Sequence, residues 1–242
     1  MTNKRKTGPV LVVTPHPDDM ESSHGGTVAR WCAEGRKVIL VVCTTGDKGT
    51  SDRSLSRKSL AVIREKEQLS SAEVLGLSDV AFLRYPDQEL EDTAEFRGRL
   101  VRLIRLHRPQ TVSVIEPNSG LLGHRDHRNC GRVTLDAVYP YAMDLHSYPE
   151  HMREGLEPHR VEEVYVWRAR ETDLYVDISD YYDTKRDALF SHVSQVGEFS
   201  EERSTWIRRG AEATGELIGV QAAERFKRID MSSLQEQGSS CL

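Results

Sequence analysis

Residues 10–19 have the sequence VLVVTPHPDD, and the rest of the chain is organised around this segment. Its apolar run VLVV predicts a short buried strand, and residues 27–34 predict a helix soon after it. His16, Asp18 and Asp19 therefore stand in a loop between a strand and a helix. In open α/β sheets, ligands and catalytic groups gather off the carboxyl ends of the strands. We therefore expect this segment to carry part of a functional site.

Strand-like and helix-like segments alternate along most of the chain. Continuous apolar or β-branched runs predict further strands at residues 37–43, 80–83, 111–115, 163–167 and 174–178. Apolar residues at helical spacing predict helices at 56–75, 95–107, 130–138 and 181–196, and from 198 to 226 with a break at Gly215. Ser179 or Asp180 is expected to cap the helix at 181–196. This alternation indicates an α/β fold with a Rossmann-like, mostly parallel sheet flanked by helices.

Polar residues follow several of the predicted strands directly. The carboxyl ends of parallel strands share one edge of a sheet, so we expect the residues after them to meet there; these are His16, Asp18, Asp19, Asp47, Asp87 and Asn118. A second polar group, His124-Arg125-Asp126-His127, precedes the helix predicted at 130–138. If that helix begins near His124, then His124 and His127 are three residues apart and share a face.

Length and composition indicate one α/β domain over residues 9–230, between a polar tail at 1–8 and a polar, disordered tail at 231–242. A formal net charge of −5 and a pI near 6.0 give no basic surface for nucleic acid. No apolar run reaches the roughly 18 residues that a membrane span requires. The four cysteines form no C-x-x-C pair, which favours reduced thiols and a cytoplasmic protein.

Two histidines and one carboxylate, drawn from the two His/Asp segments, would form a three-ligand metal site. Such a set leaves the fourth position open for water, which is the catalytic arrangement for zinc, and iron(II) also accepts these ligands. A bound metal makes water lose a proton more easily and polarises a carbonyl oxygen. Of the adjacent Asp18 and Asp19, one can bind the metal while the other accepts the proton. These features indicate metal-assisted hydrolysis of an amide or an ester.

Three motifs together resemble those of the PIG-L/LmbE-like family: His16-Pro17-Asp18-Asp19, Gly25-Gly26-Thr27 and His124-Arg125-Asp126-His127. The similarity covers most of residues 9–196 and continues through shorter motifs, namely Gly46 to Gly49, Arg64 to Glu67, Leu75-Gly76, Pro86-Asp87 and His192 to Gln195. Members of this family are zinc-dependent N-deacetylases that act mostly on substrates containing N-acetylglucosamine. The resemblance implies the same activity here, with one zinc ion per chain and a zinc-bound water as nucleophile.

The resemblance also implies roles for the motif residues. Three positions match the family's metal ligands: His16, Asp19 and His127. Asp18 matches the general base. His124 matches the histidine that stabilises the tetrahedral oxyanion or helps to protonate the leaving amine, and Asp126 stands where it can orient that histidine. Together these residues would remove acetyl from an N-acetylated amino sugar.

Arg64 and Asp87 match positions that contact the sugar in related enzymes, and His192 is a third candidate for substrate binding. Each has a structural alternative: an exposed ion pair between Arg64 and Glu67, a turn role for Asp87, and a core position for His192. The residue after the two aspartates is commonly Glu in the family but is Met20 here. This departure leaves the metal ligands intact and puts any outer contact of the usual Glu in doubt.

Two other functions remain compatible with the sequence. The first is an amidase acting on another N-acyl compound, such as a thiol conjugate of an amino sugar or an acylated antibiotic. Only the rim of the site, predicted at residues 47–58, 85–92 and 139–160, would then differ. The second is a non-catalytic sugar-binding or metal-binding protein, which the presence of both Asp18 and His124 disfavours because such a protein needs neither residue. In each case the expected partner is a small molecule, and a homo-oligomer is compatible with the sequence.

Overall fold

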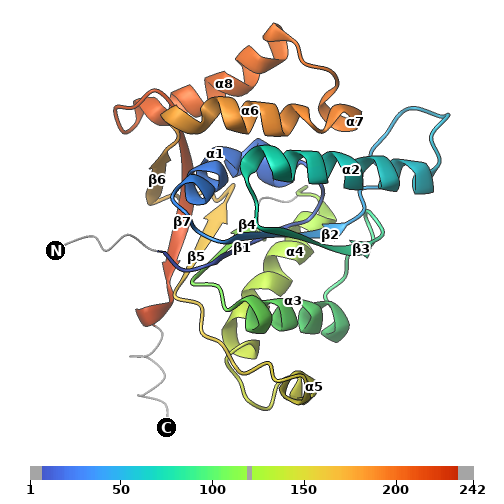
Figure 1. Cartoon of the computed structure of the whole chain (residues 1–242), viewed down its shortest axis with the longest axis vertical. Helices are drawn as coiled ribbons and strands as arrows, with labels where there is room; N and C mark the ends of the chain where they lie inside the picture. Colours follow the sequence, from blue (N-terminus) through green and yellow to red (C-terminus); the bar gives the residue numbers. More distant parts are fainter. Residues whose placement is uncertain (1–6, 119–121, 234–242) are drawn as a thin grey trace.

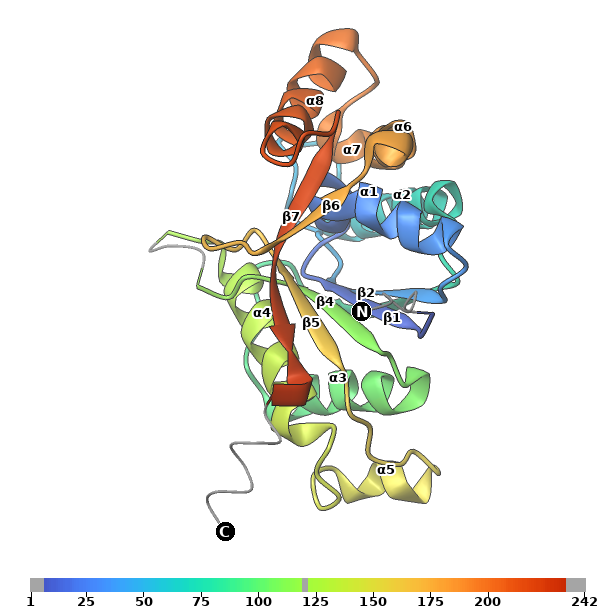
Figure 2. The same cartoon turned by 90° about the vertical axis from the view of Figure 1, so that its left-hand side faces the viewer.

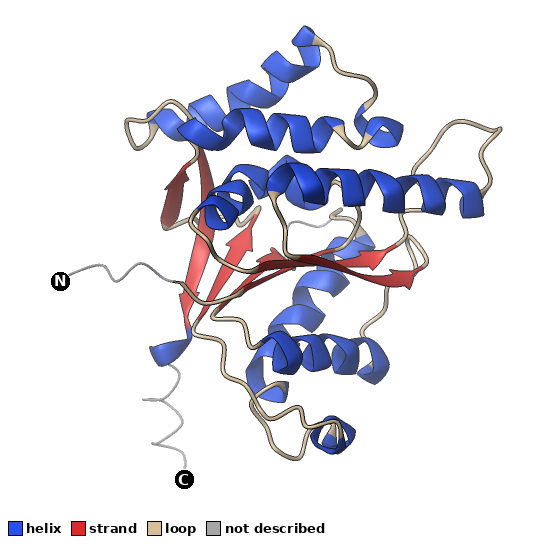
Figure 3. Ribbon diagram, in the orientation of Figure 1, coloured by secondary structure: helices blue, strands red, loops and turns tan. Residues whose placement is uncertain are grey.

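The computed structural model describes residues 7–118 and 122–233. Within these residues, seven strands form one sheet in the order β3-β2-β1-β4-β5-β7-β6. Figure 3 draws the strands in red and the helices in blue. The strands are β1 (Val10–Thr14), β2 (Val38–Thr44), β3 (Asp79–Tyr85), β4 (Thr111–Ile115), β5 (Glu163–Trp167), β6 (Leu174–Asp177) and β7 (Ala223–Asp230). The first five in the sheet order are parallel, and β7 runs antiparallel to both of its neighbours. The predicted Rossmann-like, mostly parallel sheet is therefore confirmed.

Helices cover both faces of this sheet (Figure 1). They are α1 (Asp19–Ala33), α2 (Arg57–Leu75), α3 (Ala94–His107), α4 (Arg125–Asp136), α5 (Pro149–Arg153), α6 (Tyr182–Phe190), α7 (Val193–Val196) and α8 (Glu201–Glu216). In Figure 1, α1, α2 and α6 lie above the sheet, whereas α3 and α4 lie below it. Among the described residues, no helix combines the length and the apolar content that crossing a membrane would require.

Strand β1 shows how the sheet is buried on both faces. All five of its residues are buried, and their side chains alternate between the two faces. Leu11 and Val13 pack in one apolar cluster with Leu100 of α3, whereas Val10 and Val12 pack in another. A central parallel strand is apolar throughout because helices cover it on both sides. In β1 the one polar residue, Thr14, accordingly stands at the end of the strand.

The order of the strands reverses beside β1. The chain moves from β1 to β2 and β3 on one side, and then returns to place β4 on the other side. In open α/β sheets, ligands bind at the carboxyl ends of the strands where such a reversal occurs. The segment after β1 carries His16, and the segment after β4 leads to His124 at the start of α4. The two His/Asp motifs therefore meet at this position.

The prediction of a helical segment reaching residue 226 is wrong at its end. Helix α8 stops at Glu216, and residues 223–230 form β7, which lies between β5 and β6 (Figure 2). The sequence AERFKRID has little local preference for a strand. Pairing on both sides decides its conformation, because Phe226 is paired with Trp167 of β5 and with Leu174 of β6. Tertiary contacts override local propensity here.

Helix α1 begins at Asp19, earlier than the predicted start at Thr27. A kink at His24, where φ is −146°, divides the helix. Beyond the kink, the backbone N–H groups of Gly26 and Thr27 donate to the buried carboxylate of Glu224 in β7, at 3.1 and 2.7 Å. This carboxylate takes the place of an N-cap for the second part of the helix. The helix predicted at residues 27–34 therefore corresponds to the second part of α1, after the kink at His24.

The helix predicted over 181–196 is two helices, α6 and α7. They are separate because His192 leaves the helical conformation, with φ −88° and ψ 56°. The prediction that Ser179 or Asp180 caps α6 is wrong, since α6 has no side-chain cap. Asp177 instead accepts hydrogen bonds from the backbone N and the Oγ of Ser179, at 2.9 and 2.6 Å. Ser179, one of the two predicted capping residues, is therefore engaged in this local turn.

Residues 139–160, which are predicted as part of the rim of the site, contain the short helix α5. Arg105 of α3 is buried against this segment, and its Nη2 donates to three backbone carbonyl oxygens, those of Tyr141, Asp144 and Ser147. In Figure 1, α5 lies at the bottom of the molecule, below α3. The segment is therefore fixed to α3 by its backbone.

Candidate active site

His16 follows β1 and is buried at the edge of the sheet. Its Nδ1 lies 2.9 Å from Asp19 Oδ2, and its Nε2 lies 3.1 Å from Asp126 Oδ2 and 3.1 Å from Asp87 Oδ1. Carboxylates from the segments after β1, β3 and β4 thus surround one imidazole. For these residues, the prediction that the strand ends bring polar side chains together is confirmed.

Asp18 and Asp19 face different partners because Asp18 has a left-handed backbone conformation, with φ 87°. Asp18 is the N-cap residue of α1, and Asp19 is the first helical residue. Asp18 Oδ1 lies 3.3 Å from Nη2 of Arg64. Asp19 Oδ2 lies 2.9 Å from His16 Nδ1 and 3.1 Å from His127 Nε2. One carboxylate thus bridges two histidines while its neighbour faces an arginine.

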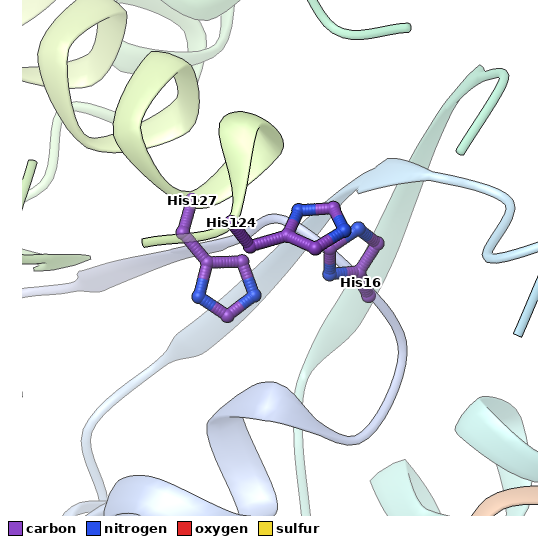
Figure 4. A group of neighbouring side chains, drawn as sticks. All are labelled: His16, His124 and His127. Atoms are coloured by element: carbon purple, nitrogen blue, oxygen red, sulfur yellow. The ribbon is translucent and has the colours of Figure 1, made fainter. Parts of the chain in front are cut away.

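Helix α4 brings the second His/Asp motif to the site (Figure 4). His124 is its N-cap residue, and His124 Nδ1 accepts a hydrogen bond from the backbone N of Asp126 at 3.2 Å. The ring centroid of His16 is 4.7 Å from that of His124 and 5.2 Å from that of His127. The helix starts at Arg125 rather than at residue 130. Because the helix begins next to His124, His124 and His127 lie three residues apart and share a face.

The charges in this cluster favour a cation. Burial lowers the pKa of His16, but the carboxylates of Asp126, Asp19 and Asp87 outweigh burial and raise that pKa to about 11. Burial also raises the pKa of Asp19, yet the neighbouring His127 and His16 hold it well below its usual range. Three carboxylates thus surround His16, and one of them, Asp19, also lies beside His127. A divalent cation would balance the negative charge of these carboxylates.

The donor atoms also have spacings that suit a metal. His16 Nδ1 and His127 Nε2 lie 2.9 and 3.1 Å from the same oxygen of Asp19. Ligand atoms around a tetrahedral zinc ion lie roughly 3.3 Å apart for bonds of about 2.0 Å. His16 Nε2 then remains for carboxylates that orient the ring. Among the described residues, two groups have all of their donor atoms within 4.8 Å of one another, namely His16, His124 and His127, and His16, Asp87, His124 and Asp126. Both groups contain His124, which is therefore also a candidate ligand. The residues present fit a divalent metal.

Asp18 lies beside this cluster and has a perturbed pKa. Burial and the negative charge of Asp19 raise the pKa of Asp18 to about 7, and the guanidinium of Arg64 opposes this increase. A carboxylate whose pKa is near neutral pH can both accept a proton and return it. The position next to a cluster that could hold a metal therefore suits a general base.

Arg64, predicted to contact the sugar, is buried beneath the loops of the site. It donates from Nη1 to the carbonyl oxygen of Gly46 at 3.0 Å and from Nη2 to that of Pro17 at 2.7 Å. Glu67, the partner in the alternative ion pair, instead accepts hydrogen bonds from the N and Oγ of Ser194 at 2.8 and 2.6 Å. Arg64 therefore fixes the loop that precedes α1, and direct contact with a substrate stays a prediction.

Asp87 and His192 are both buried, and both face other protein groups. Asp87 Oδ1 faces His16, and its Oδ2 accepts a hydrogen bond from the backbone N of Lys48 at 3.3 Å. His192 Nε2 lies 3.4 Å from Glu21 Oε1, in a position that corresponds to its core alternative. For both residues, a role in substrate binding stays a prediction.

Met20 stands where the family commonly has Glu, and Glu21 follows it; both side chains are buried. Met20 is fully buried in the apolar cluster that also contains Val28. Glu21 is buried as well, and its Oε1 accepts hydrogen bonds from Gln68 Nε2 and Ser71 Oγ at 2.5 and 2.7 Å. The methionine thus adds to the core, while the carboxylate one position later makes polar contacts with α2.

Sequence reasoning missed Arg168, which follows β5 and whose Nη1 lies 3.8 Å from Asp19 Oδ1. The rule applied to the other strand ends would have found it, because β5 is parallel to β4. Asp47, which was expected at this edge, accepts a hydrogen bond from the backbone N of Asp87 at 2.9 Å. Asn118, also expected there, is exposed. The expectation that polar residues directly after parallel strands meet at one edge of the sheet therefore holds for most of the residues that follow the strands, but not for all of them.

Comparison with known proteins identifies relatives of the chain. Residues 11–138 match the model of the family described as GlcNAc-PI de-N-acetylase. The chain is 34% identical over 221 residues to the diacetylchitobiose deacetylase of Thermococcus kodakarensis, and the alignment covers 91% of this chain and 82% of that protein. It is 24% identical to the mycothiol S-conjugate amidase of Streptomyces coelicolor, with 94% of each protein covered.

A solved structure agrees with these relatives. The N,N'-diacetylchitobiose deacetylase from Pyrococcus horikoshii, complexed with its inhibitor MPG, superposes with a TM-score of 0.85 and is 32% identical, over 92% of this chain and 84% of that one. The matches confirm the family resemblance that the paired motifs predicted. They also confirm the predicted enzyme class, a hydrolase acting on carbon–nitrogen bonds other than peptide bonds.

Proposed function

We propose that this chain, which belongs to the GlcNAc-PI de-N-acetylase family, removes the acetyl group from an N-acetylated amino sugar of the N-acetylglucosamine type. The observation that carries the proposal is the carboxylate of Asp19 between His16 and His127, with a second carboxylate, Asp18, directly beside it. Metal-assisted hydrolysis of an amide requires both a metal site and a base, and this arrangement supplies both.

In this proposal one zinc ion is held by His16, Asp19 and His127. Zinc suits two imidazoles and one carboxylate, and iron(II) accepts the same set. When bound, the metal makes water more acidic and polarises the carbonyl oxygen of the acetamide. Asp87 and Asp126 face Nε2 of His16 and would keep its Nδ1 directed at the metal.

Asp18 acts as the general base, and the leaving amine then receives a proton from Asp18 or from His124. Two observations support this role. Arg64 holds the carboxylate in place at 3.3 Å, and burial beside Asp19 raises the pKa of Asp18 to about 7. A group of this pKa exchanges a proton readily near neutral pH.

His124 donates a hydrogen bond to the oxygen that becomes negative in the transition state. Its Nδ1 accepts a hydrogen bond from the backbone N of Asp126, and this assignment places the proton of a neutral ring on Nε2. That proton is then available to the oxyanion or to the departing amine. Asp126 thus contacts both rings, His124 through its backbone N and His16 through its carboxylate.

The relatives support a substrate of the N-acetylglucosamine type. The chain is 34% identical to a diacetylchitobiose deacetylase and 24% identical to a mycothiol S-conjugate amidase. The second relative supports the alternative, an amidase for another N-acyl compound, at lower similarity. We also propose a cytoplasmic location for the protein, supported by three free thiols in the described residues, those of Cys32, Cys43 and Cys130.

Acetate release tests this proposal. The purified protein should release acetate and free amine in equal amounts from N-acetylglucosamine or N,N'-diacetylchitobiose. Chelation should abolish the release, and added zinc should restore it. Full activity in a metal-free preparation would contradict the proposed metal dependence. Release of amine only from a thiol conjugate of an N-acylated sugar would favour the amidase alternative.

A further inference from the structure

A cavity of about 760 Å³ opens beside Asp18. Part of its lining comes from the start of α1 and from Arg168, the residue that follows β5. Another part comes from α6, α7 and α8, including the apolar side chains of Leu189, Phe190 and Ile207. Cavities of this size commonly bind small molecules. The space next to the proposed base can therefore hold a substrate.

Arg168 reaches this cavity from a backbone conformation that is unusual for its residue type. Its φ is 58°, in the left-handed region that favours glycine. Such strain persists where the surrounding structure enforces it, and it occurs often at functional sites. Here the guanidinium lies over the ring of Trp167, 5.6 Å from the ring centroid, and Nη2 donates to Ser22 Oγ at 3.3 Å. These contacts hold the side chain at the cavity.

The guanidinium of Arg168 has donors left for a ligand. Its Nη1 lies 3.8 Å from Asp19 Oδ1, which is beyond hydrogen-bond distance. Asp19 already has partners in His16 and His127. The side chain of Arg168 is 45% exposed, so a molecule in the cavity can contact it.

We infer that Arg168 is a substrate-binding residue that donates to hydroxyl oxygens of the amino sugar while the acetamide lies beside Asp18. This inference rests on the proposed function and places the sugar ring at the Arg168 side of the cavity. A guanidinium presents several N–H donors in a fixed plane, which suits two neighbouring hydroxyl groups. A residue that served only as a counter-ion for Asp19 would act on the metal site instead, and this difference is measurable.

Three variants separate these roles. Arg168→Gln removes the charge, and Arg168→Gly removes the side chain while relieving the left-handed backbone, so a folding defect is not expected of it. Arg170→Gln is the matched control, because Arg170 is exposed two residues further along the same loop. For each protein, KM and kcat with N-acetylglucosamine, the metal content, and the calorimetric affinity for glucosamine are measured.

Both Arg168 variants should raise KM roughly tenfold or more, as expected when a hydroxyl oxygen of the substrate loses a charged hydrogen-bond donor. Their metal content should be unchanged, their affinity for glucosamine should fall, and Arg170→Gln should behave as the wild type. Wild-type KM and affinity in Arg168→Gly would overturn the inference. Loss of metal or of kcat alone would also overturn it and indicate a counter-ion. If the wild type releases no acetate from any N-acetyl sugar, the proposed function fails, and the calorimetric comparison decides the role of Arg168 by itself.

Discussion

The two parts of the sheet contribute differently to the candidate site. The parallel strands supply the His/Asp cluster, since the proposed metal ligands and the base lie between residues 16 and 127. The C-terminal part, residues 168–233, supplies Arg168 and a wall of the cavity from α6, α7 and α8. In Figure 2 these helices stand at the upper end of the molecule, beside β6 and β7.

This difference separates chemistry from substrate binding. The reacting groups lie where the strand order reverses, a position set by the topology of the sheet. The space for the substrate is completed by the chain that follows the last parallel strand. Variants in the first part should therefore change metal content or turnover, and variants in the second part should change substrate affinity or stability.

The largest effect is expected for His127→Ala. Removing one of three ligands should empty the metal site, and turnover should fall by more than the roughly 100-fold typical of an outer partner. Metal per chain, measured by mass spectrometry beside acetate release, checks this. His124→Ala is the matched control and should keep its metal. If His124→Ala empties the site while His127→Ala stays loaded, then the metal is held by the group that contains His124 and not His127, namely His16, Asp87, His124 and Asp126.

A smaller effect is expected for Asp126→Asn. The Asp126 carboxylate contacts His16 Nε2 and accepts hydrogen bonds from the backbone N of Gln88 and of Leu90, at 2.7 and 3.2 Å. Turnover should fall about 10- to 100-fold, because the ligand is still present but is less well oriented. Asp136→Asn, at the far end of α4, should leave turnover unchanged. A wild-type rate in Asp126→Asn would remove this residue from the site.

The smallest effect on turnover, with a large effect on stability, is expected for Glu224→Gln in the C-terminal part. This carboxylate lies 2.6 Å from Lys185 Nζ in the interior, and the variant leaves that charge unpaired. The free energy of unfolding should fall by about 3 kcal/mol, measured by chemical denaturation. Adding Lys185→Met should recover part of the loss. If Glu224→Gln loses metal while keeping its stability, the proposed separation between the two parts fails.

The parallel part is also the part that the sequence predicts well. The bounds predicted for β4 and β5 are those observed, and α2 begins after Ser56, whose side chain accepts a hydrogen bond from the backbone N of Ser59. Apolar runs, caps and helical spacing are local signals that a sequence carries directly. Spacing alone does not decide which of Asp18 and Asp19 binds the metal and which is the base. The family motifs assign these two roles.

The remaining features depend on contacts that sequence patterns do not contain. Strand β7 exists because two neighbours pair with it, and α1 resumes after its kink because Glu224, nearly 200 residues away, binds its backbone. The resemblance predicts that Arg64 and Asp87 contact the sugar, whereas the partners observed for them are protein groups, namely backbone carbonyl oxygens for Arg64 and His16 for Asp87. Which partners they face is decided only when the loops after several strands come together.

The most direct test of the whole account compares Asp18→Asn with Asp19→Asn. The two residues are adjacent and chemically identical, but only Asp19 bridges His16 and His127. Metal content and acetate release are measured on both variants. Asp18→Asn should stay loaded with metal and lose roughly 10²- to 10⁴-fold in turnover, the usual contribution of a positioned base. Asp19→Asn should lose metal first and regain some activity at high zinc. An empty Asp18→Asn beside a loaded, inactive Asp19→Asn would reverse the two roles, and two loaded, active variants would contradict the proposed hydrolysis.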